Sequence, residues 1–420
     1  MNAITSYMLL SLLALSSSAG AWQQGATGAV PGESVPPWRE GELDIHHINT
    51  GRGEAQLMVL PDGTSVLIDM SGKTSEQAPF LLPTRPDASR PPGEWVARYV
   101  RRVLPAGAVK LDYALISHFH GDHMGTIVPA SPRSPNGYQL SGITQVAELV
   151  DIAKVIDRGW PRYDYPVPMK SATMDNYRQF LDWQIRNRGL EVETFEPGRN
   201  DQIALLHGRG NYPQFEIRNL YANGLVWTGQ GAATRSLFPP LDGIPQEHHP
   251  GENELSIALR VRYGAFDYYT GGDLSAVDEE VTFEPDARKN VEPPVAHATG
   301  PVDVMKANHH GSWDANSIPF LTKLRPRVIV VPARADGHPA VNTYKRMTSQ
   351  KVWAGERDIF ITNVSDATAR TTYGVDKAAS VQGHVVIRVE RGGARYRVFV
   401  LDDANETMGV LSVHGPYESN

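Results

Sequence analysis

The nine residues that begin at position 117, Ser-His-Phe-His-Gly-Asp-His-Met-Gly, contain three histidines and an aspartate within six positions. They follow a short apolar run, Leu111 to Ile116, which predicts a β-strand. His118 and His120 are two residues apart, so in an extended segment both side chains point the same way and can bind one ion. Asp122 and His123 are adjacent and turn to different sides, within reach of a second ion. A polar surface loop is the alternative, but so dense a cluster favours a metal site at a strand end.

The cysteine count limits which metal chemistry is available. The chain has 420 residues and no cysteine, which excludes disulfides, thiolate zinc sites, iron–sulfur clusters and a cysteine nucleophile. Any metal must therefore be held by His, Asp and Glu. With such ligands two Zn²⁺ ions per chain are expected, and Mn²⁺ or Fe is the alternative, since both are compatible with the same ligands.

Composition places the chain among ordinary globular proteins. Hydrophobic residues make up 41% and charged residues 21% of the sequence. The formal net charge is −7, whereas proteins that grip nucleic-acid backbones usually carry a basic surplus. We therefore expect no strong binding to duplex nucleic acid.

The first 21 residues have the pattern of a signal peptide. Met8 to Leu15 is a short apolar core, too short to span a bilayer of ~30 Å, and Ala19-Gly20-Ala21 has the small-x-small form of a cleavage site. Cleavage would leave Trp22 as the first residue of a protein exported to the periplasm or secreted. An uncleaved N-terminal anchor is the alternative. No other stretch reaches ~18 apolar residues, so no transmembrane segment is expected in the mature chain.

Short strands and helices alternate along the rest of the chain. Two apolar runs at 57–60 and 66–68 flank a turn string and predict a hairpin. Helical spacing predicts helices at 96–104 and 174–188, the second with Thr173 as a candidate cap and Gly189 as its stop. Further strands are expected near 255–261, 266–270, 328–331, 385–389 and 397–400. This pattern predicts an α/β layered fold.

The motif His118-x-His120-x-Asp122-His123 resembles the signature of the metallo-β-lactamase superfamily of metal-dependent hydrolases. Further strings resemble its ComEC-type subgroup, named for the soluble hydrolase domain of the ComEC DNA-uptake channel. These strings, in chain order, are Ile48–Ala55, Pro61–Asp69, Asn253–Ser256, Thr270–Asp273, Asn308–Ser312 and Gly337–Pro339. The membrane channel of that family is absent from this sequence, so DNA uptake itself is not implied.

The resemblance implies a fold and a set of site residues. The fold is an αββα sandwich, two packed β-sheets flanked by helices, with metals held at one edge. By resemblance, His118 and His120 hold a first metal, Asp122 and His123 hold the second, and Asp273 bridges both. His310 completes the second site, and its neighbour His309 contacts the substrate. The expected metal ligands are therefore His118, His120, Asp122, His123, Asp273 and His310, and the expected catalytic residues are Asp122 and His309.

The sequence departs from the superfamily just before the strand that leads to Asp273. Most members carry a further metal-binding histidine there, and this chain reads Glu-His-His-Pro-Gly-Glu-Asn-Glu from position 247. Either the first metal lacks a third histidine, or His249 or Glu252 supplies the ligand. Asp69, at the end of an early strand, either orients a ligand histidine or is an ordinary strand-end residue.

The expected organisation is a signal peptide at 1–21, a flexible lead-in at 22–40, one hydrolase domain at 41–412 and a tail at 413–420. A long insert is expected at 127–250 within the domain.

The expected activity is metal-assisted hydrolysis by a metal-bound hydroxide, favoured on a phosphodiester or other phosphoester, small or oligomeric. Arg334, Lys306 and His338 are candidates to contact a phosphate. A lactone, lactam or carboxylic ester hydrolase is the alternative, and a non-catalytic binding module is a remote one.

Overall fold

The computed structural model describes residues 30–73, 80–108, 110–276 and 290–420. The signal peptide expected at 1–21 lies outside the described residues, as does the lead-in up to residue 29. The described part of the lead-in packs on the C-terminal end of the chain: Gly32 N donates to Val410 O at 2.8 Å. Within the described ranges, no helix is both long enough and apolar enough to cross a membrane.

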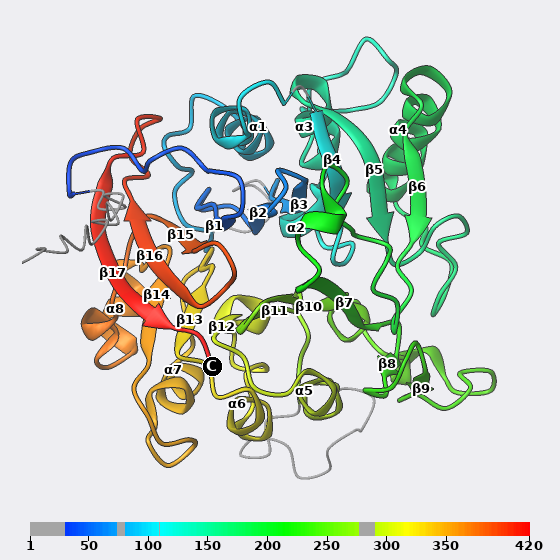
Figure 1. The fold of residues 1–420 in the computed structure, drawn as a ribbon. Coiled ribbons are helices and arrows are strands. Elements are labelled where there is room, and N and C mark those ends of the chain that lie inside the picture. The colour runs from blue at the N-terminus through cyan, green and yellow to red at the C-terminus, as the bar shows by residue number, and fades with distance from the viewer. Residues whose placement is uncertain (1–29, 74–79, 109, 277–289) are drawn as a thin grey trace, which may run out of the picture.

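The first sheet has nine strands in the order β17-β16-β15-β1-β2-β3-β4-β5-β6 (Figure 1). Neighbours are antiparallel from β17 to β3 and parallel from β3 to β6. The strands are β1 Leu43–His47, β2 Ala55–Val59, β3 Ser65–Met70, β4 Lys110–Leu115, β5 Asp151–Asp157, β6 Glu191–Thr194, β15 His384–Val389, β16 Arg395–Leu401 and β17 Val410–Glu418.

The second sheet has eight strands in the order β14-β13-β12-β11-β10-β7-β8-β9. Neighbours are parallel from β14 to β11 and antiparallel from β11 to β9. The strands are β7 Phe215–Ala222, β8 Leu225–Trp227, β9 Thr234–Ser236, β10 Ala258–Tyr263, β11 Phe266–Thr270, β12 Val304–Lys306, β13 Val328–Val331 and β14 Asp358–Ile361.

Helices cover the outer faces of both sheets, with α1, α3 and α4 beside the first sheet and α5, α6 and α7 beside the second (Figure 1). The α-helices are α1 Pro92–Val103, α2 Gly121–Met124, α3 Ile143–Leu149, α4 Ala172–Arg188, α5 Glu292–Thr299, α6 Ile318–Leu324, α7 Val341–Thr348 and α8 Asp366–Thr371. Short 3-10 turns occupy Arg209–Asn211, Gln246–His248, Asn253–Leu255, Asn308–Gly311 and Val375–Lys377.

Alternation along the strands explains why the layers pack in this way. On the hairpin of β2 and β3, Met58 and Val66 contribute to the core between the sheets, whereas Leu57 and Leu67 pack under the helices. Successive strand side chains point to opposite faces, so a strand in the middle of such a sandwich is buried on both sides. The expected αββα sandwich, two sheets flanked by helices, is confirmed.

The expected helices form with small shifts at their ends. The helix expected at 96–104 is α1, which ends at Val103, two residues before Pro105. The helix expected at 174–188 is α4, and its cap is Ser171 instead of Thr173: Ser171 Oγ accepts a hydrogen bond from Met174 N at 3.2 Å. Gly189 ends this helix in a left-handed conformation, φ +68°, as the sequence predicts.

Two expected boundaries differ from the structure. The segment 127–250, expected as an insert within the domain, supplies β5 and β6 to the first sheet and β7, β8 and β9 to the second, so it forms part of the sandwich itself. Residues 413–418 lie in β17, where a tail was expected. Both segments mix polar residues with apolar ones, because β5, β6 and β17 are only partly covered, and their hydrophobic pattern is correspondingly weak.

A buried ion pair joins β1 to β15. Asp44 lies opposite Arg388, which donates from Nε to Oδ1 at 2.8 Å and from Nη2 to Oδ2 at 2.6 Å. Burial alone would raise the pKa of Asp44, but Arg388 lowers that pKa to about 2. A carboxyl group with a lowered folded pKa stabilises the fold above its unfolded pKa, and this contribution is lost as the pH falls through the folded pKa.

We therefore expect Asp44→Asn to lower the free energy of unfolding at pH 7 by at least about 2 kcal/mol and to flatten its decline between about pH 4 and pH 2. Urea unfolding at several pH values measures both effects. Asp242→Asn, at an exposed position, is the matched control. An unchanged pH profile in the Asp44 variant would contradict the expectation.

Candidate metal centre

The residues expected to bind metal lie at neighbouring strand ends. His118 follows β4 by three residues, Asp273 follows β11 by three, and the 3-10 turn Asn308–Gly311 follows β12. Asp122 and His123 lie in α2, which is drawn between the two sheets (Figure 1). Loops that leave the carboxyl ends of neighbouring parallel strands meet at one edge, and here both sheets contribute such loops.

Four of these side chains form one buried group. His123 Nε2 lies 3.2 Å from His310 Nε2 and 3.2 Å from Asp273 Oδ2. His310 Nε2 lies 3.4 Å from the same Asp273 oxygen and 3.3 Å from Asp122 Oδ2. Nitrogen and carboxylate oxygen atoms at this spacing surround a space suited to one ion.

A second group shares Asp273 with the first. His118 Nε2 lies 3.1 Å from His120 Nδ1 and 3.8 Å from Asp273 Oδ2. His118 and Asp273 are buried, while His120 is exposed, so the cluster opens toward solvent at His120. The structure thus brings together all six residues expected as ligands, and their role in binding metal stays a prediction.

The hydrogen bonds of the histidine rings indicate that several nitrogen lone pairs face one another. His123 Nδ1 lies 2.7 Å from Asp69 Oδ2, and His310 Nδ1 lies 3.0 Å from Pro332 O. Because both partners are acceptors, these ring nitrogens carry the protons, and each Nε2 of a neutral ring has a free lone pair. Two lone pairs that face each other at 3.2 Å repel unless a cation or proton lies between them. The residues therefore fit a bound metal ion.

Asp273 provides a further sign of this fit. Both of its carboxylate oxygens are buried and have no hydrogen-bond partner within the described residues. Burial lowers the pKa of His118 well below its ordinary value, so its neutral, ligating form is favoured. Unpaired carboxylate oxygens in such a site are expensive unless an ion binds them.

Asp69 orients one of the candidate ligands. Its Oδ2 lies 2.7 Å from His123 Nδ1, and its Oδ1 accepts a hydrogen bond from Ser117 N at 2.8 Å. A carboxylate on the outer ring nitrogen fixes the tautomer and the direction of the histidine. Of the two interpretations of Asp69, the structure therefore favours the orienting one.

The two adjacent histidines after β12 take different positions. His310 is fully buried in the cluster, whereas His309 Nε2 lies 3.7 Å from Asp273 Oδ2 and its Nδ1 lies 2.7 Å from Asp314 Oδ1. The His309 side chain keeps 17% of its surface exposed. The expected roles, His310 as a metal ligand and His309 as a residue that contacts substrate, stay predictions.

Neither proposed replacement for the missing histidine is grouped with His118, His120 and Asp273 among the described residues. His249 Nε2 lies 2.9 Å from Ile244 O. Glu252 forms an ion pair with Arg158 and accepts a hydrogen bond from Phe119 N at 2.8 Å. The first group therefore consists of His118, His120 and the shared Asp273.

Sequence reasoning missed a role for Glu54. This residue is grouped with His123, Asp273 and His310 as a possible ligand, and it forms a buried ion pair with Lys306 at 2.7 Å. Lys306 is therefore not available to contact a phosphate. The string Ile48–Ala55 contains Glu54 and is used above only for its resemblance, since a single carboxylate far from the motif gives no signal by itself.

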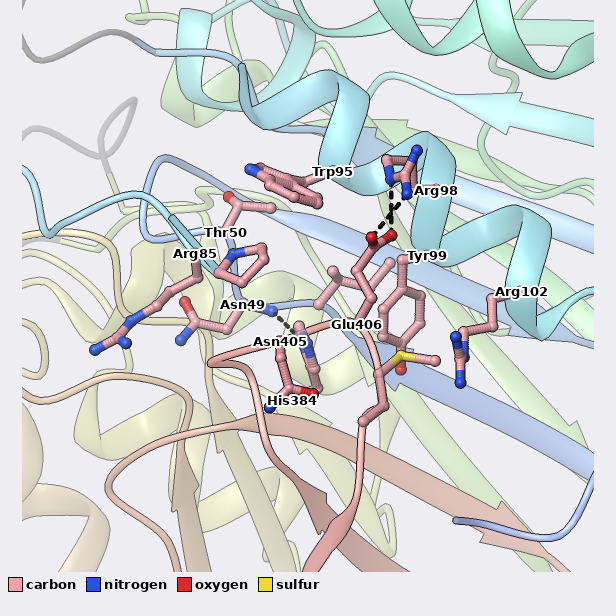
Figure 2. A pocket seen from close by; sticks show the side chains of 13 residues that line it. Asn49, Thr50, Arg85, Trp95, Arg98, Tyr99, Arg102, His384, Asn405 and Glu406 are labelled. Atoms are coloured by element: carbon pink, nitrogen blue, oxygen red, sulfur yellow. Dashed lines mark hydrogen bonds and ion pairs between the residues drawn. The ribbon is translucent and has the colours of Figure 1, made fainter. Parts of the chain in front are cut away.

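A pocket separate from the histidine cluster lies between α1 and the loop after β16 (Figure 2). Arg98 reaches across it to Glu406 with two hydrogen bonds of 2.7 Å, and Asn49 N donates to His384 Nδ1 at 3.0 Å. None of the residues that line it belongs to the histidine cluster. It adds nothing to the metal centre.

Comparisons with known proteins add little to the description of the site. No protein-family model and no curated protein matches the chain. A solved structure of a mutant of CmlA beta-hydroxylase is similar at 13% identity and a TM-score of 0.37. The match covers 84% of this chain and 55% of that one, so this chain spans about half of its length. A match this weak carries no argument.

The structure's own features are more informative. The two-sheet α/β sandwich carries, at its edge, a buried His/Asp/Glu cluster that could hold a metal ion.

We expect the purified protein to carry one to two transition-metal ions per chain, because facing ring nitrogens and unpaired carboxylates need a cation. Elemental analysis measures this, and a strong chelator should remove the ions and lower the melting temperature. No bound metal, even after incubation with zinc or manganese, would contradict the expectation.

We also expect Asp273→Ala to reduce metal content and activity far more than His249→Ala does. Asp273 lies near both histidine groups, whereas His249 lies outside both and has its Nε2 against the backbone oxygen of Ile244. Metal analysis and hydrolysis assays on both variants test this. Equal, wild-type values for the two variants would show that Asp273 is not a shared ligand.

Proposed function

We propose that the protein is an exported metal-dependent hydrolase that acts on a phosphodiester or another phosphoester. The observation that carries this proposal is the position of Asp273, within 4 Å of ring nitrogens from both histidine groups. A carboxylate shared in this way suits a pair of ions, and two-metal sites are well suited to phosphoryl oxygens. The ComEC-type strings of the sequence support the same substrate class.

The bound ions would supply an activated water and stabilise charge on the attacked group. The residues of the chain orient the metal ligands and hold or transfer protons beside the ions. Asp69 holds His123 in one direction, and Pro332 O does the same for His310. His309 is held by Asp314 and keeps Nε2 toward the cluster, so it can hold a proton for the leaving group. Asp122 is proposed as the remaining ligand and catalytic carboxylate.

The proposed cofactor is a pair of Zn²⁺ ions, with Mn²⁺ or Fe as alternatives that bind the same donors. The proposed partner is a small-molecule or oligomeric phosphoester, with weak affinity for duplex nucleic acid because the net charge is −7. Export rests on the signal peptide pattern at 1–21.

We expect the metal-loaded protein to hydrolyse bis-p-nitrophenyl phosphate, and to do so faster than it hydrolyses a lactone, nitrocefin or a carboxylic ester. The reason is that an in-line attack on phosphorus benefits from two ions that hold its oxygens. Parallel assays on one preparation with measured metal content test this, with Asp273→Ala as the inactive control.

Activity on the carbonyl substrates without activity on any phosphoester would move the function to the alternative class. Metal binding without turnover of either class would indicate a binding module. Tight, salt-sensitive binding to a long DNA duplex would show that the overall charge does not describe the site.

A further inference from the structure

Two cations from different loops converge on the carboxylate of Asp122. Lys73, just after β3, has its Nζ 3.7 Å from Asp122 Oδ1. Arg334, just after β13, forms an ion pair through Nε with Asp122 Oδ2. One carboxylate therefore faces two positively charged side chains at the edge of the histidine cluster.

Arg334 is held firmly and keeps an unused donor. The residue is 8% exposed, and its Nη1 is buried with no hydrogen-bond partner in the described part of the chain. Its backbone oxygen accepts a hydrogen bond from Leu82 N at 3.0 Å. On the same loop, the ring of His338 stacks on that of His310 at 5.5 Å. A buried donor without a partner costs about 1–3 kcal/mol, so its retention suggests a partner from outside the protein.

Metal binding would weaken the ion pair between Arg334 and Asp122 and so leave the guanidinium group freer to bind an anion. Asp122 Oδ2, the oxygen paired with Arg334, also faces His310 Nε2 at 3.3 Å and His123 Nε2 at 3.6 Å. An ion held by these nitrogens competes with Arg334 for the same oxygen. The guanidinium group then has fewer anionic contacts, and a planar fork of donors binds phosphate oxygens well.

We propose that Arg334, assisted by Lys73, is an anion subsite that binds the non-reacting, negatively charged oxygen of the phosphoester and, after hydrolysis, the phosphate product. This inference rests on the proposed function and narrows it to anionic substrates. Neutral lactones and esters offer no charge to this subsite. Lys306 takes no part, because it is buried against Glu54.

The test is the binding of inorganic phosphate to the full chain, loaded with metal and freed of excess ion, by titration calorimetry. We expect Arg334→Gln to weaken phosphate binding at least tenfold, Arg334→Lys to weaken it less, and Lys73→Gln to weaken it about threefold. Metal content should stay at the wild-type level in all three. Arg101→Gln, an exposed arginine on α1, is the matched control and should bind phosphate as the wild type does.

Several outcomes would overturn the inference. The first is that the wild type binds no phosphate. The second is that metal-loaded Arg334→Gln binds phosphate with an affinity within twofold of the wild type. The third is that Arg334→Gln loses metal, which would make Arg334 a positioning residue for Asp122. Should Arg334→Gln fail to fold, unchanged affinity in both Arg334→Lys and Lys73→Gln overturns it.

The test also separates this inference from the proposed function. Phosphate binding that depends on Arg334, in a protein that hydrolyses no phosphoester, supports the anion subsite and rejects the proposed activity. If the protein hydrolyses a phosphoester, and Arg334→Gln has the KM and the phosphate affinity of the wild type, the proposed function is supported and the anion subsite is rejected.

Discussion

The carboxylate of Asp69 links the three elements that form one side of the metal centre. It lies at the end of β3, accepts hydrogen bonds from Ser117 N and Oγ after β4, and holds His123 of α2 through Nδ1. These contacts of 2.7–2.8 Å use both of its oxygens. Since β3 and β4 are parallel neighbours, one buried carboxylate can reach both the following loop and the helix. The direction of His123 follows from this contact.

A second buried carboxylate supports the other side. Glu292 of α5 accepts hydrogen bonds from Asn308 Nδ2 at 2.9 Å, Asn316 N at 2.6 Å and Ser317 N at 2.7 Å. These contacts fix the ends of the segment that carries His309 and His310, both of which have positive φ, +46° and +54°. Positive φ costs of order 1–3 kcal/mol for such residues, and it persists where surrounding contacts determine the backbone. The position of His310 therefore depends on Glu292, about eighteen residues earlier in the chain.

Local patterns explain which parts of this structure the sequence could predict. The histidine motif lies within six consecutive residues, and β13 is a continuous apolar run, so their positions were predictable. Resemblance supplied Asp273 and His310. The pairs Glu54–Lys306 and Asp122–Arg334 join residues more than 200 positions apart, and only the packed sheets bring them together. The sequence pattern did not predict the strands within 127–250 for a related reason. Their alternation of polar and apolar residues is weak, and their positions depend on the strands with which they pair.

Charge at the site differs from charge over the whole chain, and this difference bears on the substrate. Around the cluster, the carboxylates of Glu54, Asp69, Asp122 and Asp273 are accompanied by the cations Lys73, Lys306 and Arg334. Four negative groups against three positive ones leave a single negative charge when the histidines are neutral. Two divalent ions would exceed that charge and make the centre clearly positive, although the chain carries −7 in total. Under the proposed function, such a centre in a chain with a negative net charge would bind a compact anionic substrate more readily than a long polyanion.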